Sequence, residues 1–186
     1  MAVLSRLAKD AAFTARMAGL LRKIIPLARN PARIFPDEME MLAAKFGERP
    51  ALTSDRETLT YAGLDRRANR YARWAKAHGV GKGDTVCLLM PNRPEFVAVW
   101  LGVARAGGVT ALLNTNLAGM ALAYSINIVK AKHVIVAAEL ADQFATAEEL
   151  VAPETEIWLH GGTGGRTAMR AGRRRMASSR ATRSAC

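Results

Sequence analysis

Short apolar runs alternate with longer, helix-like segments between residues 85 and 159, and this alternation constrains the fold more than any other feature. Each run is five or six residues long and almost continuously apolar, which is typical of a strand buried on both faces of a parallel sheet. The runs are 85–90, 109–113, 133–137 and 155–159. Because strands joined through helices form right-handed crossovers, the sequence predicts an α/β fold, a parallel sheet with flanking helices.

Proline and glycine mark the ends of these elements. Pro91 ends the first apolar run, and Pro94 suits the first turn of a helix that runs to about residue 106. Gly107 and Gly108 end that helix. Two further helices are predicted over 118–129 and 140–150.

A hairpin and a long helix are predicted before this alternation. Residues 51–53 and 58–60 read as two strands joined by the polar turn 54–57. Thr60 suits the N-cap of the next helix. That helix ends near His78, where Gly79 favours the left-handed C′ conformation.

Several short words in this order resemble the front part of the AMP-forming acyl-CoA synthetases, most closely the fatty acid transport protein (very-long-chain acyl-CoA synthetase) branch. The words are Pro91-Asn92, Glu95-Phe96, Ala106-Gly107-Gly108, Leu113-Asn114-Thr115-Asn116-Leu117, Ser125-Ile126-Asn127 and Ala131-Lys132. The resemblance covers about residues 34–160 and departs from the family at Gly63, where an acidic residue commonly supports the helix start. It implies the first subdomain of the adenylate-forming fold.

The resemblance also implies a reaction: a long-chain fatty acid, ATP and CoA give acyl-CoA, AMP and pyrophosphate, with magnesium. In the family, the residues that bind ATP and perform this chemistry follow the segment covered here. The last lysine of this chain is Lys132 and its last acidic residue is Glu156. We therefore assign no catalytic, cofactor-binding or metal-binding residue to the chain and expect it to be inactive alone.

Other candidate sites are weaker. Gly161–Gly165 follows a predicted strand, but its spacing fits neither known phosphate-loop pattern, so a flexible connector is the preferred interpretation. His78, His133 and His160 are too scattered to predict a metal site. Ser125 and Cys87 have no evident triad partners.

Residues 1–35 form the first of three expected regions, and they read as an amphipathic helix ending near Pro26. Three interpretations stay open: a helix docked on the rest of the protein, an interfacial membrane helix, and a mitochondrial transit peptide. The second region, 36–160, is the expected N-terminal part of an AMP-dependent synthetase domain.

The third region, 161–186, is expected to be a disordered Gly/Arg-rich tail. Seven Arg and no acidic residue fall in 165–186, so much of the net charge of +11 belongs to this tail. Its abrupt composition resembles a high-GC gene read out of frame, so a frameshift or premature stop near Gly165 is the leading hypothesis for this segment. Nucleic acid is not the expected partner, because the tail lacks interleaved aromatic residues.

The alternative function is a non-enzymatic module that binds a membrane surface or a polyanion through the basic ends. A small nucleotide-binding α/β protein is a third hypothesis. Two cysteines, Cys87 and Cys186, suit a reducing compartment. No apolar run is long enough to span a bilayer, so we expect a cytoplasmic protein or one that lies peripherally on the inner face of the membrane.

Overall fold

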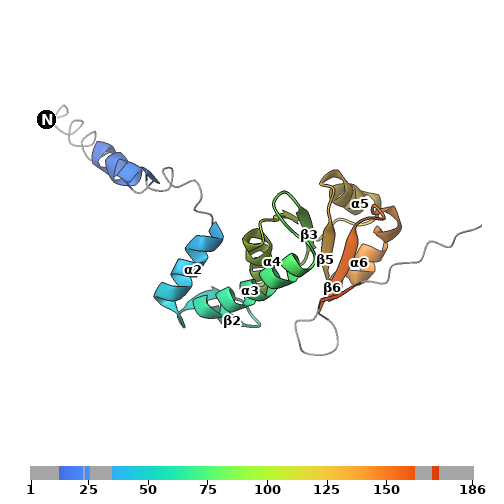
Figure 1. Cartoon of the computed structure of the whole chain (residues 1–186), viewed down its shortest axis with the longest axis horizontal. Helices are drawn as coiled ribbons and strands as arrows, with labels where there is room; N and C mark the ends of the chain where they lie inside the picture. Colours follow the sequence, from blue (N-terminus) through green and yellow to red (C-terminus); the bar gives the residue numbers. More distant parts are fainter. Residues whose placement is uncertain (1–12, 23, 26–34, 162–168, 172–186) are drawn as a thin grey trace, which may run out of the picture.

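A five-stranded sheet forms the centre of the computed structural model, which describes residues 13–22, 24–25, 35–161 and 169–171 (Figure 1). The strands lie in the order β4-β3-β5-β6-β7. The first four are mutually parallel, as predicted, and β7 pairs antiparallel with β6. Their bounds are β3 Thr85–Leu89, β4 Val109–Leu112, β5 His133–Ala137, β6 Glu156–His160 and β7 Met169–Ala171.

Helices cover both faces of this sheet. Helices α3 (Tyr61–Ala77) and α4 (Pro94–Arg105) pack on one face, and α5 (Gly119–Ile128) and α6 (Ala141–Ala145) pack on the other. Side chains of β3 alternate between the two layers: Val86 and Leu88 belong to the first, and Cys87 and Leu89 to the second. The largely apolar strand β3 therefore has a core on each side, which is the environment that its sequence predicts.

The predicted hairpin and helix caps are confirmed. Strands β1 (Pro50–Thr53) and β2 (Thr58–Thr60) pair antiparallel. The Thr60 hydroxyl accepts a hydrogen bond from the Gly63 amide at 3.0 Å and so caps α3. Gly79 follows this helix with φ +69°, the left-handed conformation that glycine adopts without strain.

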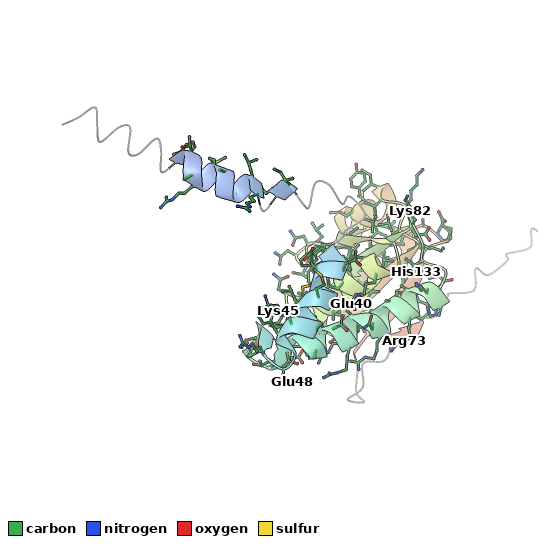
Figure 2. The ribbon with its side chains drawn as sticks, turned by 60° about the vertical axis from the view of Figure 1, so that its left-hand side comes forward. Glu40, Lys45, Glu48, Arg73, Lys82 and His133 are labelled. Carbon is green, nitrogen blue, oxygen red and sulfur yellow. The ribbon has the colours of Figure 1, made fainter. Side chains whose placement is uncertain are left out.

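Helix α2 (Phe35–Phe46) was not predicted from the sequence. It packs beside α3 and α4 on the first face of the sheet, and Met39 contacts the buried cluster there. Figure 2 shows exposed charged side chains of these helices, among them Glu40 and Lys45 of α2 and Arg73 of α3.

The prediction of a single helix over 140–150 is wrong. The structure divides this segment into a 3₁₀ turn at Ala138–Leu140, the short α6 and a second 3₁₀ turn at Glu148–Leu150. The Thr146 hydroxyl donates to the Gln143 carbonyl and accepts from the Gly119 amide. These bonds hold the end of α6 against the start of α5, so tertiary contacts override the local helical pattern.

The disordered tail expected over 161–186 contains regular structure in its described part. Met169, Arg170 and Ala171 form β7 and pair with His160, Leu159 and Trp158. Residues 162–168 and 172–186, which include most of the predicted connector, lie outside the described residues.

Residues 13–22, 24 and 25 are helical, in agreement with the amphipathic pattern. All twelve are exposed, so this part of the helix does not dock on the sheet or its helices. Residues 1–12 and 23, which belong to the helix expected before Pro26, and residues 26–34 lie outside the described residues.

The α3–α4 contact depends on a glycine. A Cβ atom at Gly102 would lie 2.4 Å from Tyr71 Cβ and 2.7 Å from the Ala68 carbonyl oxygen. Gly102→Ala should therefore lower the free energy of unfolding by roughly 1–3 kcal/mol, because the two helix backbones must separate. Urea unfolding followed by circular dichroism measures this. Gly81→Ala is the matched control, since a Cβ there meets its nearest atom at 4.0 Å, and an equal loss in both variants would contradict the packing argument.

Candidate functional site

A hollow of about 810 Å³ lies where strands β3, β5 and β6 end. Residues that follow these strands line it, among them Asn92, Glu139 and Gly161, and the hairpin turn Ser54–Glu57 forms another wall. The chain passes from β3 to β4 on one side and then returns to β5 on the other side of β3. The hollow thus lies at the carboxyl edge of the sheet beside a topological switch point, which is the usual ligand position in open α/β sheets.

A buried carboxylate forms one wall of this hollow. Glu95, in the first turn of α4, is 5% exposed. Its Oε2 accepts a hydrogen bond from Arg67 Nη1 at 2.6 Å, and its Oε1 accepts one from the Tyr71 hydroxyl. His160 Nε2 lies 2.8 Å from the Tyr71 oxygen and 3.5 Å from Glu95 Oε1. We call Arg67, Tyr71, Glu95 and His160 the Glu95 cluster.

The proton positions in the Glu95 cluster follow from its chemistry. An ionised carboxylate can only accept, so Tyr71 donates its single proton to Glu95 and accepts from His160 Nε2–H. His160 Nδ1 has no hydrogen-bond partner among the described residues, although the side chain is buried. The cluster joins α3, α4 and the end of β6.

Electrostatics keep Glu95 ionised. Burial alone raises the pKa of Glu95, but hydrogen bonds from His160 and Tyr71 and the charge of Arg67 outweigh it and lower the pKa to about 2. Burial, and then the charge of Glu95, raise the pKa of Tyr71 above its usual range. A carboxylate with such a low pKa is a poor base near neutral pH, and Tyr71 is a poor acid. The Glu95 cluster is therefore better suited to holding α3, α4 and β6 in place than to transferring a proton.

Arg67 extends the cluster to the hairpin. Its guanidinium binds both oxygens of Glu57 at 3.0 and 2.9 Å while it contacts Glu95. Hydrogen bonds to Glu57 and the charge of Glu95 outweigh burial and raise the pKa of Arg67. Across the hollow, Arg93 pairs with Glu139 at 2.5 Å. Three of the carboxylates that line the hollow are therefore already bound to arginine.

These groups do not fit a magnesium ion. No group of three or more His, Cys, Asp or Glu suited to a metal occurs within the part of the chain that the structure describes. Because Glu57, Glu95 and Glu139 each bind an arginine, a cation would have to displace that partner. We derive no metal-dependent step here.

Of the three histidines considered from the sequence, the structure brings His78 and His133 together, with ring centroids 6.4 Å apart, and leaves His160 apart from them. His133 starts β5, where its Nε2 lies 3.1 Å from the His78 carbonyl oxygen and its Nδ1 accepts from Trp158 Nε1 at 3.3 Å. His160 lies at the opposite end of the sheet, in the Glu95 cluster. Burial lowers the pKa of His133, which suits a neutral core histidine. No metal site joins the three.

The other sequence candidates have structural partners. Cys87 is buried in β3, and burial raises the pKa of its thiol to about 12. Ser125 Oγ donates to the Ala121 carbonyl within α5. Lys132 Nζ donates to the Gly79 carbonyl at 2.5 Å and to Asp84 Oδ2 at 3.1 Å, so the last lysine of the chain fastens the α3–β3 loop.

Sequence reasoning missed the Glu95 cluster. Its members come from α3, α4 and β6, and His160 is 89 residues from Tyr71. Glu95 was noted only as part of a family word. A charged residue directly after Pro94, in a helix that is otherwise apolar up to Arg105, was the available signal.

Comparisons with known proteins place these elements in one family. The family described as "AMP-binding enzyme" matches residues 39–175, so the match continues past Gly165. Long-chain fatty acid transport protein 2 of Rattus norvegicus is 35% identical over 136 residues, which cover 72% of this chain and 22% of that protein. A 3-hydroxybenzoate–CoA/4-hydroxybenzoate–CoA ligase of Thauera aromatica is 44% identical over 85 residues, or 46% of this chain and 16% of that protein. The chain thus spans about a fifth of the length of these relatives.

A solved structure agrees with the fold. A benzoate CoA ligase from Burkholderia xenovorans superimposes with a TM-score of 0.63 at 24% identity, over 68% of this chain and 26% of that one. The parallel sheet and its helices therefore correspond to the N-terminal subdomain of adenylate-forming enzymes.

The Glu95 cluster predicts a pH dependence of stability. The folded-state pKa of Glu95, about 2, lies below its unfolded value of about 4.3, so the carboxylate stabilises the fold above pH 4.3 and loses this contribution as pH falls toward 2. Glu95→Gln should flatten the fall in unfolding free energy over this window and cost roughly 1–3 kcal/mol at pH 7.

Urea unfolding at about pH 2.5 to 7 measures both the pH dependence of the unfolding free energy and its loss at pH 7. Glu40→Gln, at an exposed position of α2, is the control. Parallel pH profiles for Glu95→Gln and the unsubstituted chain would contradict the assignment.

Proposed function

Since the chain belongs to the AMP-binding enzyme family, we propose that it is the N-terminal scaffold of a ligase for long-chain or very-long-chain fatty acids. The parent reaction joins a fatty acid to CoA with ATP cleaved to AMP and pyrophosphate. The proposal that the substrate is a fatty acid rests on the similarity to a long-chain fatty acid transport protein over 72% of the chain. The proposed scaffold comprises residues 36–160.

The same proposal holds that the chain alone has no ligase activity and holds no ATP, magnesium or CoA. Adenylation needs charged groups placed around the phosphates and the metal. In the described residues, Lys132 is engaged with Gly79 and Asp84 at the amino end of the sheet, away from the hollow. Of the carboxylates that line the hollow, Glu57, Glu95 and Glu139 are bound to arginines, and Glu95 is held ionised.

We further propose peripheral membrane contact through the N-terminal region. Six large apolar residues of the described helix are 40–65% exposed: Phe13, Met17, Leu20, Leu21, Ile24 and Ile25. At 100° per residue they occupy one side of the helix, and Arg16 and Arg22 lie off it. No described helix is long and apolar enough to cross a bilayer. Exposed apolar side chains beside arginines suit the surface of an anionic membrane.

The polyanion alternative depends on the basic tail, most of which lies outside the described residues. No contact or charge cluster of the described residues favours it over the ligase scaffold.

The scaffold proposal predicts no fatty-acid-dependent ATP–pyrophosphate exchange by the purified chain above a blank preparation. Radiolabelled pyrophosphate with ATP, magnesium and oleate measures this directly, and the Thauera aromatica ligase with its own substrate is the positive control. Exchange that depends on oleate and on the folded chain would overturn the proposal.

The membrane proposal predicts that the chain floats with vesicles containing anionic phosphatidylglycerol and less with neutral phosphatidylcholine vesicles. Leu20→Glu with Ile24→Glu should reduce flotation at least tenfold, because it places carboxylates on the apolar side. Ala15→Glu with Gly19→Glu adds the same charge on the opposite side and is the matched control. If both double variants float alike, the apolar side is not the contact.

A further inference from the structure

Two histidines and two tryptophans pack together toward the amino end of the sheet. Trp74 lies in the last turn of α3 and His78 directly follows it, His133 starts β5, and Trp158 lies in β6. The ring centroids of His78 and Trp158 are 4.4 Å apart, and those of Trp74 and Trp158 are 5.2 Å apart. We call these four residues the His133 cluster. Figure 2 shows His133 beside the end of α3.

Hydrogen bonds define where His133 carries its proton. Its Nε2 lies 3.1 Å from the His78 carbonyl oxygen, which can only accept, so Nε2 is protonated and donates. Nδ1 is then a free acceptor, and Trp158 Nε1 donates to it at 3.3 Å. His133 and Trp158 are only 2% and 9% exposed. A neutral His133 thus links the end of α3 to β5 and β6 within the core.

A second proton on His133 is incompatible with this arrangement. It would bind Nδ1, and the new N–H would face the indole N–H of Trp158, which can only donate. Glu156 is the replacement partner, since its Oε2 lies 3.6 Å from Nδ1 on a side chain that is 40% exposed. Acceptors for an indole are scarce here, because Trp74 Nε1 is itself buried with no hydrogen-bond partner among the described residues.

The groups that face His133 set the pH at which this proton binds. Burial lowers the pKa of His133 below its ordinary value of 6.5. The hydrogen bond to the His78 carbonyl and the charge of Glu156 raise this pKa, and the charges of Lys132 and His78 lower it. Lys132 is itself paired with Asp84. As pH falls below 6.5, the unfolded chain therefore binds the proton before the folded chain does, and the unfolding free energy decreases.

We propose that the His133 cluster is a pH-sensitive switch, in which a proton on Nδ1 exchanges Trp158 for Glu156 as the partner of His133. The exchange releases the Trp158 indole, which packs against His78 and Trp74 at the end of α3. The end of α3 is therefore held more tightly to the sheet at neutral pH than at about pH 5. The switch uses only residues of this chain and does not depend on the proposed ligase function.

Nitrogen-15 correlation spectra of the full chain between about pH 8 and 5 test the exchange, because each of the three tryptophans gives one indole N–H signal. Trp158→Phe identifies the Trp158 signal, which should titrate, whereas the signal of Trp100 should stay in place. His78→Gln should still show this titration, and His133→Gln should abolish it.

Three results of these spectra would overturn the proposal. The first is a Trp158 signal that does not change with pH, and the second is a titration that persists in His133→Gln. The third is a simultaneous collapse of all three indole signals, because the fold would then melt as a whole instead of switching locally.

The titration midpoint of His133 is a second measurement, and it leaves His133 in place. Carbon-13 correlation spectra of the histidine rings give this midpoint. Trp158→Phe should raise it, because the neutral form loses its hydrogen bond, and Glu156→Gln should lower it, because the protonated form loses its acceptor. Glu154→Gln removes the same charge at an exposed position and should leave the midpoint unchanged. Equal midpoints in Trp158→Phe, Glu156→Gln and the unsubstituted chain would contradict the exchange of partners.

Discussion

The central strand β3 must be covered on both faces, and most of the structure follows from that constraint. Val86, Cys87, Leu88 and Leu89 are completely buried. Fully burying such side chains contributes about 1.5–3 kcal/mol each, which requires one layer of helices on each side. Helix α4 reaches β4 over one face, and α5 and α6 reach β5 and β6 over the other. This reversal of direction at β3 creates the switch point beside the hollow.

Polar contacts fix the relative positions of the hairpin, helices and strands, which apolar packing alone does not determine. At the carboxyl end of the sheet, Arg67 binds Glu57 of the hairpin and Glu95 of α4, while Tyr71 links Glu95 to His160. At the amino end, Lys132 binds Gly79 and Asp84. The Lys132–Asp84 pair is largely exposed, whereas Glu95 is buried. A buried charge is costly when unpaired, so the Glu95 cluster specifies one arrangement of hairpin, helices and strands. The hydrogen bonds and ion pair that lower the pKa of Glu95 thus hold the elements of the fold together.

The sequence predicts the sheet well because its signals are local. Residues 86–90 and 134–137 are apolar throughout, and Thr60, Gly79 and Pro94 mark helix ends by their own local chemistry. The Glu95 cluster could not be predicted, since it depends on the folded position of His160 relative to Tyr71. The segment 140–150 was predicted wrongly for a similar reason: Gln143 and Thr146 bind backbone groups near the start of α5. Trp100 stacks on Phe35 of α2, with ring centroids 5.5 Å apart, and remains exposed, a contact that the sequence did not predict because α2 itself was not predicted.

We propose that residues 36–160 form a scaffold and that the chemistry of the family reaction is carried by other segments of the longer relatives. A chimera tests this division most directly: residues 36–160 replace the matching part of the Thauera aromatica ligase, and AMP release is measured with 3-hydroxybenzoate, ATP and CoA. We expect a folded chimera that releases AMP with the substrate preference of the Thauera enzyme. A folded chimera without activity, or one with a changed substrate preference, would contradict it.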